Sequence, residues 1–481
     1  MNKISIILLV ATIFLINGCS LSPKLQDSNF TMPEDMLEQN LTINNKWWEQ
    51  YNDFVLNSLV EEGLENNKDL QIAMLNIDYA RVSLRLKQAD WLPTINAQGG
   101  ANRIKTSKEA YNSQGVSRVY NDFSLSAVLS YEIDLWGKVA SSNKAARANL
   151  LASKANADVV RLSIASTIVD SYFAFISFKE QLSIANETIK TREETVNLTK
   201  LRFDAGAERE SVLSQQKSLL AQAKITRDTI EQNLHLTSSA LGILLGRQPA
   251  DLLVDKEIMA SKLPNDIVVP EYIPTSILSY RPDVEASYQE LISSNELIGV
   301  NRAAYFPSIS INGLLGLQSA NSGDLLQSSA KTWSIGGSFI APLIDFGKTR
   351  NNVELSRIQK DISVLNYEKT VITAFGEVYD ALNNRRIYSQ NLQNANELES
   401  SLQRTADLVT EQYDAGYTDY LNVLDSERSL LDAKLSVIST KHSLLSSGVS
   451  LFKALGGGWS KETYEEEYNK RVAEKNKKEN D

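Results

Sequence analysis

The sequence predicts a mostly α-helical protein with a small β part, in which two tandem repeats supply strands to a composite transmembrane β-barrel and helices to a long coiled-coil barrel. Three observations lead to this prediction. The phrase Phe-Asp-Ala-Gly at 203–206 returns as Tyr-Asp-Ala-Gly at 413–416, which is 210 residues later. Short segments alternate apolar and polar side chains, and residues 138–203 contain neither proline nor glycine.

Composition excludes several classes of function. The 481 residues carry a net charge of −10, with two histidines and one cysteine, and no Lys/Arg run is interleaved with aromatic residues. No nucleic-acid partner is therefore expected, and one cysteine cannot form an intramolecular disulfide. Few histidines and cysteines argue against a metal site. We find no nucleophile–base set or phosphate loop, so we predict no catalytic residue, no cofactor and no enzyme.

The N-terminus resembles a bacterial lipoprotein signal. Lys3 precedes an apolar core at residues 4–16, which is too short to span a bilayer as a helix. The sequence INGC follows, so we predict a signal peptide at 1–18 and Cys19 as the lipidated N-terminus of a linker at 19–46. The residue after Cys19 is Ser20 and not an aspartate, which resembles the pattern that sorts lipoproteins to the outer membrane. An ordinary signal peptide with a chance cysteine is the alternative.

The internal repeat sets the remaining boundaries. ADWLPTI at 89–95 returns as AAYFPSI at 303–309, and LGILLG ending at Gly246 returns as LFKALG ending at Gly456. Landmarks in one order at nearly one spacing indicate a tandem duplication. We therefore assign residues 47–246 to the first repeat and 275–459 to the second. The proline-containing residues 247–274 are predicted to link them, and the charged residues 460–481 to form a tail.

Each repeat opens with a predicted helix, at 55–89 or 277–303, and two alternating segments follow it. Period two places one apolar and one polar face on a strand, and about ten residues suit a tilted strand that crosses a hydrocarbon core. Two soluble hairpins, each with one wet face, are the alternative. The apolar positions are Ile95, Ala97, Gly99, Ala101, Phe123, Leu125, Ala127, Leu129, Tyr131 and Ile133 in the first repeat, and Ile309, Ile311, Gly313, Leu315, Leu317, Trp333, Ile335, Gly337, Phe339, Ala341 and Leu343 in the second.

A lipid environment would force these strands into a shared barrel. Every backbone N–H and C=O in lipid needs a partner, so spanning strands have to close on themselves. The smallest such barrels use about eight strands, so several copies of a four-strand chain must combine. The mature sequence holds no run of about 18 apolar residues, so we expect no helix to cross the membrane.

Long helices complete each repeat. Apolar residues step by three, four or seven along 160–196 and 372–409, which predicts a seam where helix packs on helix. A helix over 138–203 would be roughly 100 Å long. Gly206 and Gly416 interrupt the two patterns and suit left-handed C-caps. We therefore predict that each of these glycines turns the chain at the tip of a helical hairpin.

Two other motifs are interpreted as structural. Trp47 and Trp48 could anchor at a membrane interface, but they lie far in sequence from the strands, so we favour packing against the helical wall. Pro282, in the sequence Arg281-Pro282-Asp283, suits the first turn of a helix.

Four longer stretches carry a family resemblance. They are WWEQYNDFVLNSLVEEGLENNKDL from Trp47, RPDVEASYQEL from Arg281, IGVNRAAYFPSISI from Ile298 and LFKALGGGW from Leu451. With the INGC signal they are spread along nearly the whole mature chain and resemble the TolC-like outer-membrane efflux proteins of the NodT-type lipoprotein branch. No single stretch would be specific alone.

The resemblance implies a homotrimer with a twelve-stranded barrel and a twelve-helix periplasmic tunnel, lipid-anchored in the outer membrane of a Gram-negative bacterium. It also implies docking, through a periplasmic membrane fusion (adaptor) protein, onto an inner-membrane pump, typically of the resistance-nodulation-division type. The chain would be a passive exit duct for drugs or other toxic small molecules, and the sequence does not select among drugs, dyes, metal ions and siderophores. A lipid-anchored coiled-coil protein of the envelope without a pore is the alternative.

The same resemblance places the gate of the pore at the hairpin tips. Acidic side chains from three copies repel one another at short range and favour cations. Relatives often carry an acid six residues after the tip glycine, where this chain has Val212 and Asn422. Tip charges that are merely solvated, or that dock the adaptor, are the alternative. The candidates are Asp204, Glu208 and Glu210 at the first tip, with Arg209 as their partner, and Tyr413, Asp414, Asp419 and Asp425 at the second.

Overall fold

The structure is a computed structural model that describes residues 21–25, 44–107, 109, 118–248, 251–267 and 281–459. Cys19, most of the 19–46 linker and the tail at 460–481 lie outside these ranges. In chain order the first repeat comprises η1 (Trp47–Tyr51), α2 (Phe54–Asn66), α3 (Lys68–Ala89), β1 (Thr94–Lys105), β2 (Val119–Ile133), α4 (Lys138–Asp204) and α5 (Glu210–Leu245). The second comprises α8 (Pro282–Ala303), β3 (Ser308–Ser319), β4 (Lys331–Ile340), α9 (Lys348–Asp414) and α10 (Tyr420–Ala454).

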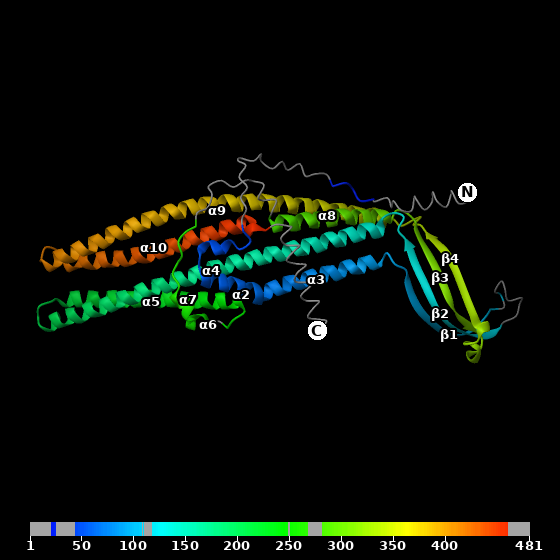
Figure 1. Cartoon of the computed structure of the whole chain (residues 1–481), viewed down its shortest axis with the longest axis horizontal. Helices are drawn as coiled ribbons and strands as arrows, with labels where there is room; N and C mark the ends of the chain where they lie inside the picture. The colour runs from blue at the N-terminus through cyan, green and yellow to red at the C-terminus, as the bar shows by residue number, and fades with distance from the viewer. Residues whose placement is uncertain are drawn as a thin grey trace. The chain divides into compact units, whose positions relative to one another are not determined.

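The chain divides into two compact units, and each unit takes residues from both repeats. Unit 1 comprises Met1–Phe30, Asn76–Ser153 and Ala286–Tyr367, and it contains the sheet. Unit 2 comprises Thr31–Leu75, Lys154–Glu285 and Glu368–Asp481. In unit 2, α5 returns along α4 and α10 returns along α9, as two helical hairpins (Figure 1).

The four predicted strands form one antiparallel sheet in the order β1-β2-β3-β4 (Figure 1). The central pair, β2 with β3, joins the two repeats, and its register places Leu125 opposite Leu317 and Tyr131 opposite Ile311. The mostly helical fold with a small β part, predicted from hydropathy patterning, is therefore confirmed.

The core of unit 2 explains the tryptophan pair. Trp47 is fully buried and its ring stacks on that of Phe452, with centroids 4.9 Å apart. Trp48 is also buried, and its ring meets that of Trp47 edge to face. Both side chains pack inside the protein, which confirms the structural interpretation of this motif.

The segment predicted to link the repeats also contributes to this core. It forms two short helices, α6 (Asp251–Val254) and α7 (Lys256–Ala260), and buries Leu252 and Ile258. An extended stretch follows, in which the Leu263 N–H donates to Glu180 Oε1 and the Leu263 carbonyl accepts from Lys441 Nζ. The segment thus packs against helices of both repeats.

Helix α4 meets the length and composition criteria for crossing a membrane. We expected no helix to cross the membrane because we looked for an uninterrupted apolar run, whereas an 18-residue window of α4 reaches the criterion by its mean hydropathy. Half of that window is buried inside the protein, and α4 supplies Ile168, Tyr172 and Phe173 to the core of unit 2. These residues make α4 a core helix of this fold.

The helix predicted at 55–89 is in fact two helices, because Asn67 caps a new one. Its Oδ1 accepts hydrogen bonds from the backbone N–H groups of Asp69, at 2.9 Å, and Leu70, at 3.2 Å. Its Nδ2 donates to the carbonyl of Leu244 in the last turn of α5, at 3.0 Å. One side chain therefore begins α3 and satisfies an otherwise free carbonyl at the end of the returning helix.

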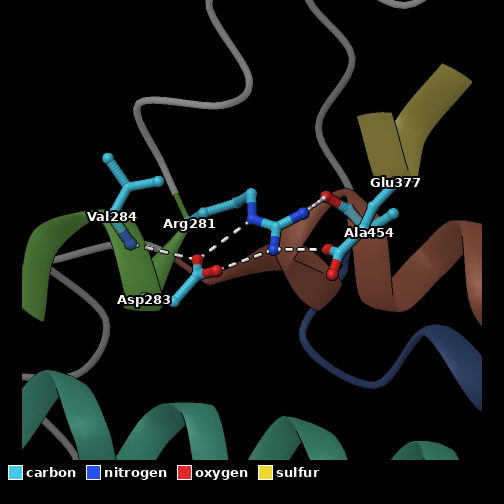
Figure 2. Close-up of polar contacts among 5 residues, drawn as sticks. All are labelled: Arg281, Asp283, Val284, Glu377 and Ala454. Atoms are coloured by element: carbon cyan, nitrogen blue, oxygen red, sulfur yellow. Dashed lines mark hydrogen bonds and ion pairs between the residues drawn. The ribbon is translucent and has the colours of Figure 1, made fainter. Parts of the chain in front are cut away.

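The second repeat builds the same junction from a charged residue (Figure 2). Arg281, which is 6% exposed, donates through Nη1 to the carbonyl of Ala454 at 2.7 Å. Its guanidinium also bonds the carboxylates of Asp283 and Glu377, each at 2.7 Å from Nη2. Burial alone would lower the pKa of Arg281, but these two carboxylates raise it. The Arg-Pro-Asp motif thus links the start of α8 to α9 and to the end of α10.

Candidate membrane face, subunit edges and helical tips

The sheet has one continuous apolar face. The register aligns the predicted apolar positions across all four strands, as in Ile95 opposite Leu129 and Leu315 opposite both Ala127 and Trp333. Large side chains on this face are exposed: Leu315 is 69% exposed, Trp333 73% and Ile335 74%. A soluble hairpin would bury such a face, whereas contact with lipid tails explains it.

The opposite face is polar and nearly uncharged. Its paired positions include Gln98 with Ser126, Ser130 with Asn312 and Ser310 with Ser338. The acids that the register places on this face are Asp122 and Glu132. Asp122 accepts a hydrogen bond from Gln318 and Glu132 pairs with Lys138 at 3.0 Å, so both have partners. A wet lumen suits this face.

Two edges of the sheet are open within this chain. The sheet order leaves the outer sides of β1 and β4 without a neighbouring strand in the described ranges. These are long edge strands with exposed apolar side chains, and in lipid each unpaired N–H or C=O costs several kcal/mol. The edges therefore require pairing with another copy of the chain.

The helices next to these two edges carry exposed apolar stripes. Helix α3, which leads into β1, exposes five apolar side chains at spacings of three and four residues, and α9, which follows β4, exposes six at three, four or seven. Such stripes are typical of coiled-coil seams. They are Ile72, Leu75, Tyr79, Val82 and Leu86 on α3, and Leu355, Ile358, Ile362, Leu365, Ile372 and Tyr379 on α9. Sequence analysis assigned the α9 residues from 372 onward to a seam and missed the α3 stripe, although its spacing was visible.

The hairpin tips are two copies of one turn. Gly206 (φ +75°) and Gly416 (φ +82°) both adopt the left-handed conformation. At the first tip the N–H of Ala207 donates to the carbonyl of Arg202, and at the second the N–H of Tyr417 donates to that of Gln412. This Schellman pattern ends α4 and α9 and reverses the chain.

The predicted gate residues surround these turns. Asp204 and Asp414 are the last residues of α4 and α9, Glu210 begins α5, and all three are exposed. Glu208 is half-buried, and its Oε1 accepts from the backbone N–H of Arg209, which is the contact the structure shows between this pair.

At the second tip, Asp425 pairs with Arg428 on the surface of α10 at 2.7 Å. Asp419 precedes α10 and makes no capping hydrogen bond through its side chain. Tyr413 contacts Tyr420, with ring centroids 4.8 Å apart. Asp419 is therefore the more available of the two acids for a charged ring, and the gating role of all these residues stays a prediction.

A partly buried ion pair near the tips was not predicted from the sequence. Arg192 of α4 is 5% exposed and lies 3.9 Å from Glu427 of α10, so the pair joins the two repeats. Burial raises the pKa of the Glu427 carboxyl, and Arg192 partly counters this shift. Burial and the nearby Glu427 raise the pKa of Tyr420 to about 12. A cleft of about 490 Å³, lined by α4, α9 and α10, contains Arg192 and Glu427. Because Arg192 and Glu427 are far apart in the sequence, no local pattern predicted that they would pair.

Among the residues that the structure describes, no cluster of three or more His, Cys, Asp or Glu side chains could hold a metal ion.

Comparison with known proteins identifies the family. The sequence model of a family described as "Outer membrane efflux protein" matches residues 59–247 and again residues 273–457. The chain belongs to the outer membrane efflux protein family. Its two matches correspond to the two tandem repeats.

Individual relatives match along nearly the whole chain. The "Probable efflux pump outer membrane protein TtgC" of Pseudomonas putida is 31% identical over 471 residues, which cover 95% of this chain and 96% of the relative. The "Cation efflux system protein CusC" of Escherichia coli is 29% identical, with 92% and 96% covered. The crystal structure of the Campylobacter jejuni CmeC outer membrane channel aligns with a TM-score of 0.86 at 32% identity, covering 92% of this chain and 96% of that one.

Proposed function

We propose that three copies of this chain form the outer-membrane exit duct of a tripartite efflux pump. The observation that carries the proposal is the exposed apolar face that runs in register across all four strands, between two open edges. A pore-free coiled-coil protein anchored by lipid would give such a face no role. Membership in the outer membrane efflux protein family supports the same conclusion.

The width of the barrel sets the smallest number of copies that leaves a passage, and we propose that number. Two copies would give eight strands, and a barrel of about that size is filled by its own side chains. Three copies give twelve strands and leave an aqueous passage lined by the serine- and asparagine-rich face. In such a ring β4 of one copy pairs with β1 of the next, and the stripe on α9 meets the stripe on α3 of the neighbour.

We propose that the chain is passive and does not choose the cargo. Relatives at nearly the same identity have names that specify toluene, antibiotic and cation efflux. The duct is therefore expected to accept what an inner-membrane pump, coupled through a periplasmic adaptor, delivers to it. We assign no catalytic role to any residue, and we propose that Cys19 carries the covalent lipid that anchors the N-terminus.

Oligomeric state and export together test the proposal. Native mass spectrometry of the protein purified in mild detergent should show trimers, and a strictly monomeric protein would overturn the proposal. Deleting the gene should raise sensitivity to at least one class of toxic compound and increase its accumulation in the cell, and re-expression should reverse both. Unchanged tolerance and accumulation across all classes would exclude an efflux role.

A further inference from the structure

Residues 21–23 of the chain lie in a polar niche between α4 and α8 of unit 1. The Leu21 carbonyl accepts a hydrogen bond from Arg302 Nη1 at 3.0 Å, and the Pro23 carbonyl accepts one from Asn295 Nδ2 at 2.9 Å. Between them the Ser22 hydroxyl donates to Glu296 Oε2 at 2.8 Å. Three consecutive residues are thus fixed by three side chains of one helix.

The niche is formed by one face of α8 together with one residue of α4. Asn295, Gly299 and Arg302 follow at spacings of four and three, so they share a helical face. The hydroxyl of Ser141, on α4, lies 3.1 Å from that of Ser22 and completes the pocket from the other repeat. Asn295 and Ser141 are each only 1% exposed, so these partners belong to the interior of unit 1.

Gly299 provides the space for this segment. A Cβ at this position would overlap the Ser22 hydroxyl and lie 2.9 Å from both Ser141 Oγ and the Ser22 backbone nitrogen. Glycine costs roughly 1 kcal/mol relative to alanine inside a helix. Its presence within α8, four residues before the end of the helix, is explained by the backbone that packs against it.

We propose that this niche is a docking site for the mature N-terminus, and that it sets the place where a lipid on Cys19 enters the membrane. The proposal rests on the proposed function and on lipidation of Cys19, which itself lies outside the described residues. Two residues span at most about 7 Å, so the lipidated residue is tethered close to Leu21. Arg302 lies in the last turn of α8, and β3 begins at Ser308.

The position of the niche determines where the acyl chains enter the bilayer. Acyl chains tethered at the end of α8 reach the bilayer beside the helix-proximal end of the sheet, whose apolar face has to enter the same bilayer. Because Ser22 contacts both α4 and α8, docking also braces the two repeats where they enter the sheet. The tether and the sheet are therefore inserted as one unit.

A disulfide between the docked segment and α4 tests the niche directly. The natural chain has a single cysteine, which the lipid occupies, so Ser22→Cys with Ser141→Cys adds a unique pair of thiols. We expect most molecules to form this disulfide in the oxidising periplasm, as scored by protection from a maleimide before reduction. Ser22→Cys with Ser153→Cys, three helical turns further along α4, is the matched control and should stay reduced. Equal cross-linking in both pairs, or in neither, would overturn the docking site.

A second pair of variants tests the effect on insertion. Gly299→Leu fills the niche, and we expect it to lower the amount of trimer in the outer membrane at least threefold. Cys19 should still be acylated in this variant, which mass spectrometry of the N-terminal peptide measures. Gly323→Leu is the control, because a Cβ there meets no atom within 4 Å. Unchanged trimer in Gly299→Leu, or a wild-type N-terminus without acyl chains, would overturn the tether role. A wild-type protein that cross-links at the niche but neither trimerises nor exports would instead overturn the proposed function.

Discussion

The two faces of β4 provide a direct test of membrane insertion. Ile335 and Ser334 are adjacent residues near the middle of this ten-residue strand, and they point to opposite faces. Ile335 lies on the apolar face opposite Gly313 and is 74% exposed, whereas Ser334 lies on the polar face opposite Leu314. We therefore compare Ile335→Arg with Ser334→Arg, which add the same charge one residue apart.

The expected difference is large. An arginine that faces lipid at the midplane of a barrel costs about 2–4 kcal/mol, which corresponds to about 30- to 700-fold in the folding equilibrium of each copy. Three copies in one barrel would lose about 6–12 kcal/mol. The arginine of Ser334→Arg points into the wet lumen, and most surface substitutions change stability by no more than about 0.5 kcal/mol.

The assay is the yield of trimer that inserts into lipid vesicles over a urea series, with the outer-membrane fraction of cells as a second measurement. Ile335→Arg should shift the midpoint of trimer insertion to a much lower urea concentration and reduce the amount of protein in the outer-membrane fraction. Ser334→Arg should match the natural protein in both measurements. Equal behaviour of the two variants would refute a lipid-facing sheet, because a solvated face tolerates an arginine at position 335.

Three other predictions follow from the polar contacts. Arg281→Ala should lower the free energy of unfolding by about 1–3 kcal/mol, because two carboxylates and the α10 carbonyl lose their partner. Asn67→Ala removes an uncharged cap and should lower it by about 1 kcal/mol. Chemical denaturation measures both losses, and equal losses would contradict the role of charge. Burial lowers the pKa of His442 below its ordinary value of 6.5, and Asp170 partly opposes this shift. Below pH 6.5 the unfolded chain therefore takes up a proton that the folded protein does not, so stability should fall as the pH drops. His442→Gln should flatten this pH dependence of the melting temperature in thermal melts. Asp419→Asn should reduce the preference for cations over anions in planar bilayers, measured by reversal potential under a salt gradient; an unchanged potential would exclude a charged ring there.

Local signals in the sequence predicted the repeating architecture. Period-two alternation identified the four strands, and their register aligns the apolar positions that the alternation marked. Gly206 and Gly416 identified the turns, because a left-handed residue at a helix end strongly favours glycine. Both signals depend on only a few neighbouring residues, which is why one sequence was sufficient to detect them.

Features that depend on distant residues were not predictable in the same way. Asn67 breaks a continuous helical pattern, but its role as a cap depends on the carbonyl of Leu244, far along the chain. The bridge from Arg192 to Glu427 crosses from one repeat to the other, and neither residue has a distinctive local context. The niche for Ser22 combines residues from both repeats. In each case the partner is set by packing, which sequence periodicity does not encode.

The two tips share a backbone and differ in chemistry. The turn at Gly206 is followed by Ala-Glu-Arg, whereas the turn at Gly416 is followed by Tyr-Thr-Asp. A ring of three chains therefore presents six turns of the same backbone geometry, which alternate between two chemically different surfaces. A partner that repeats itself six times around such a ring has to accommodate both kinds, so neighbouring copies of that partner cannot be bound identically.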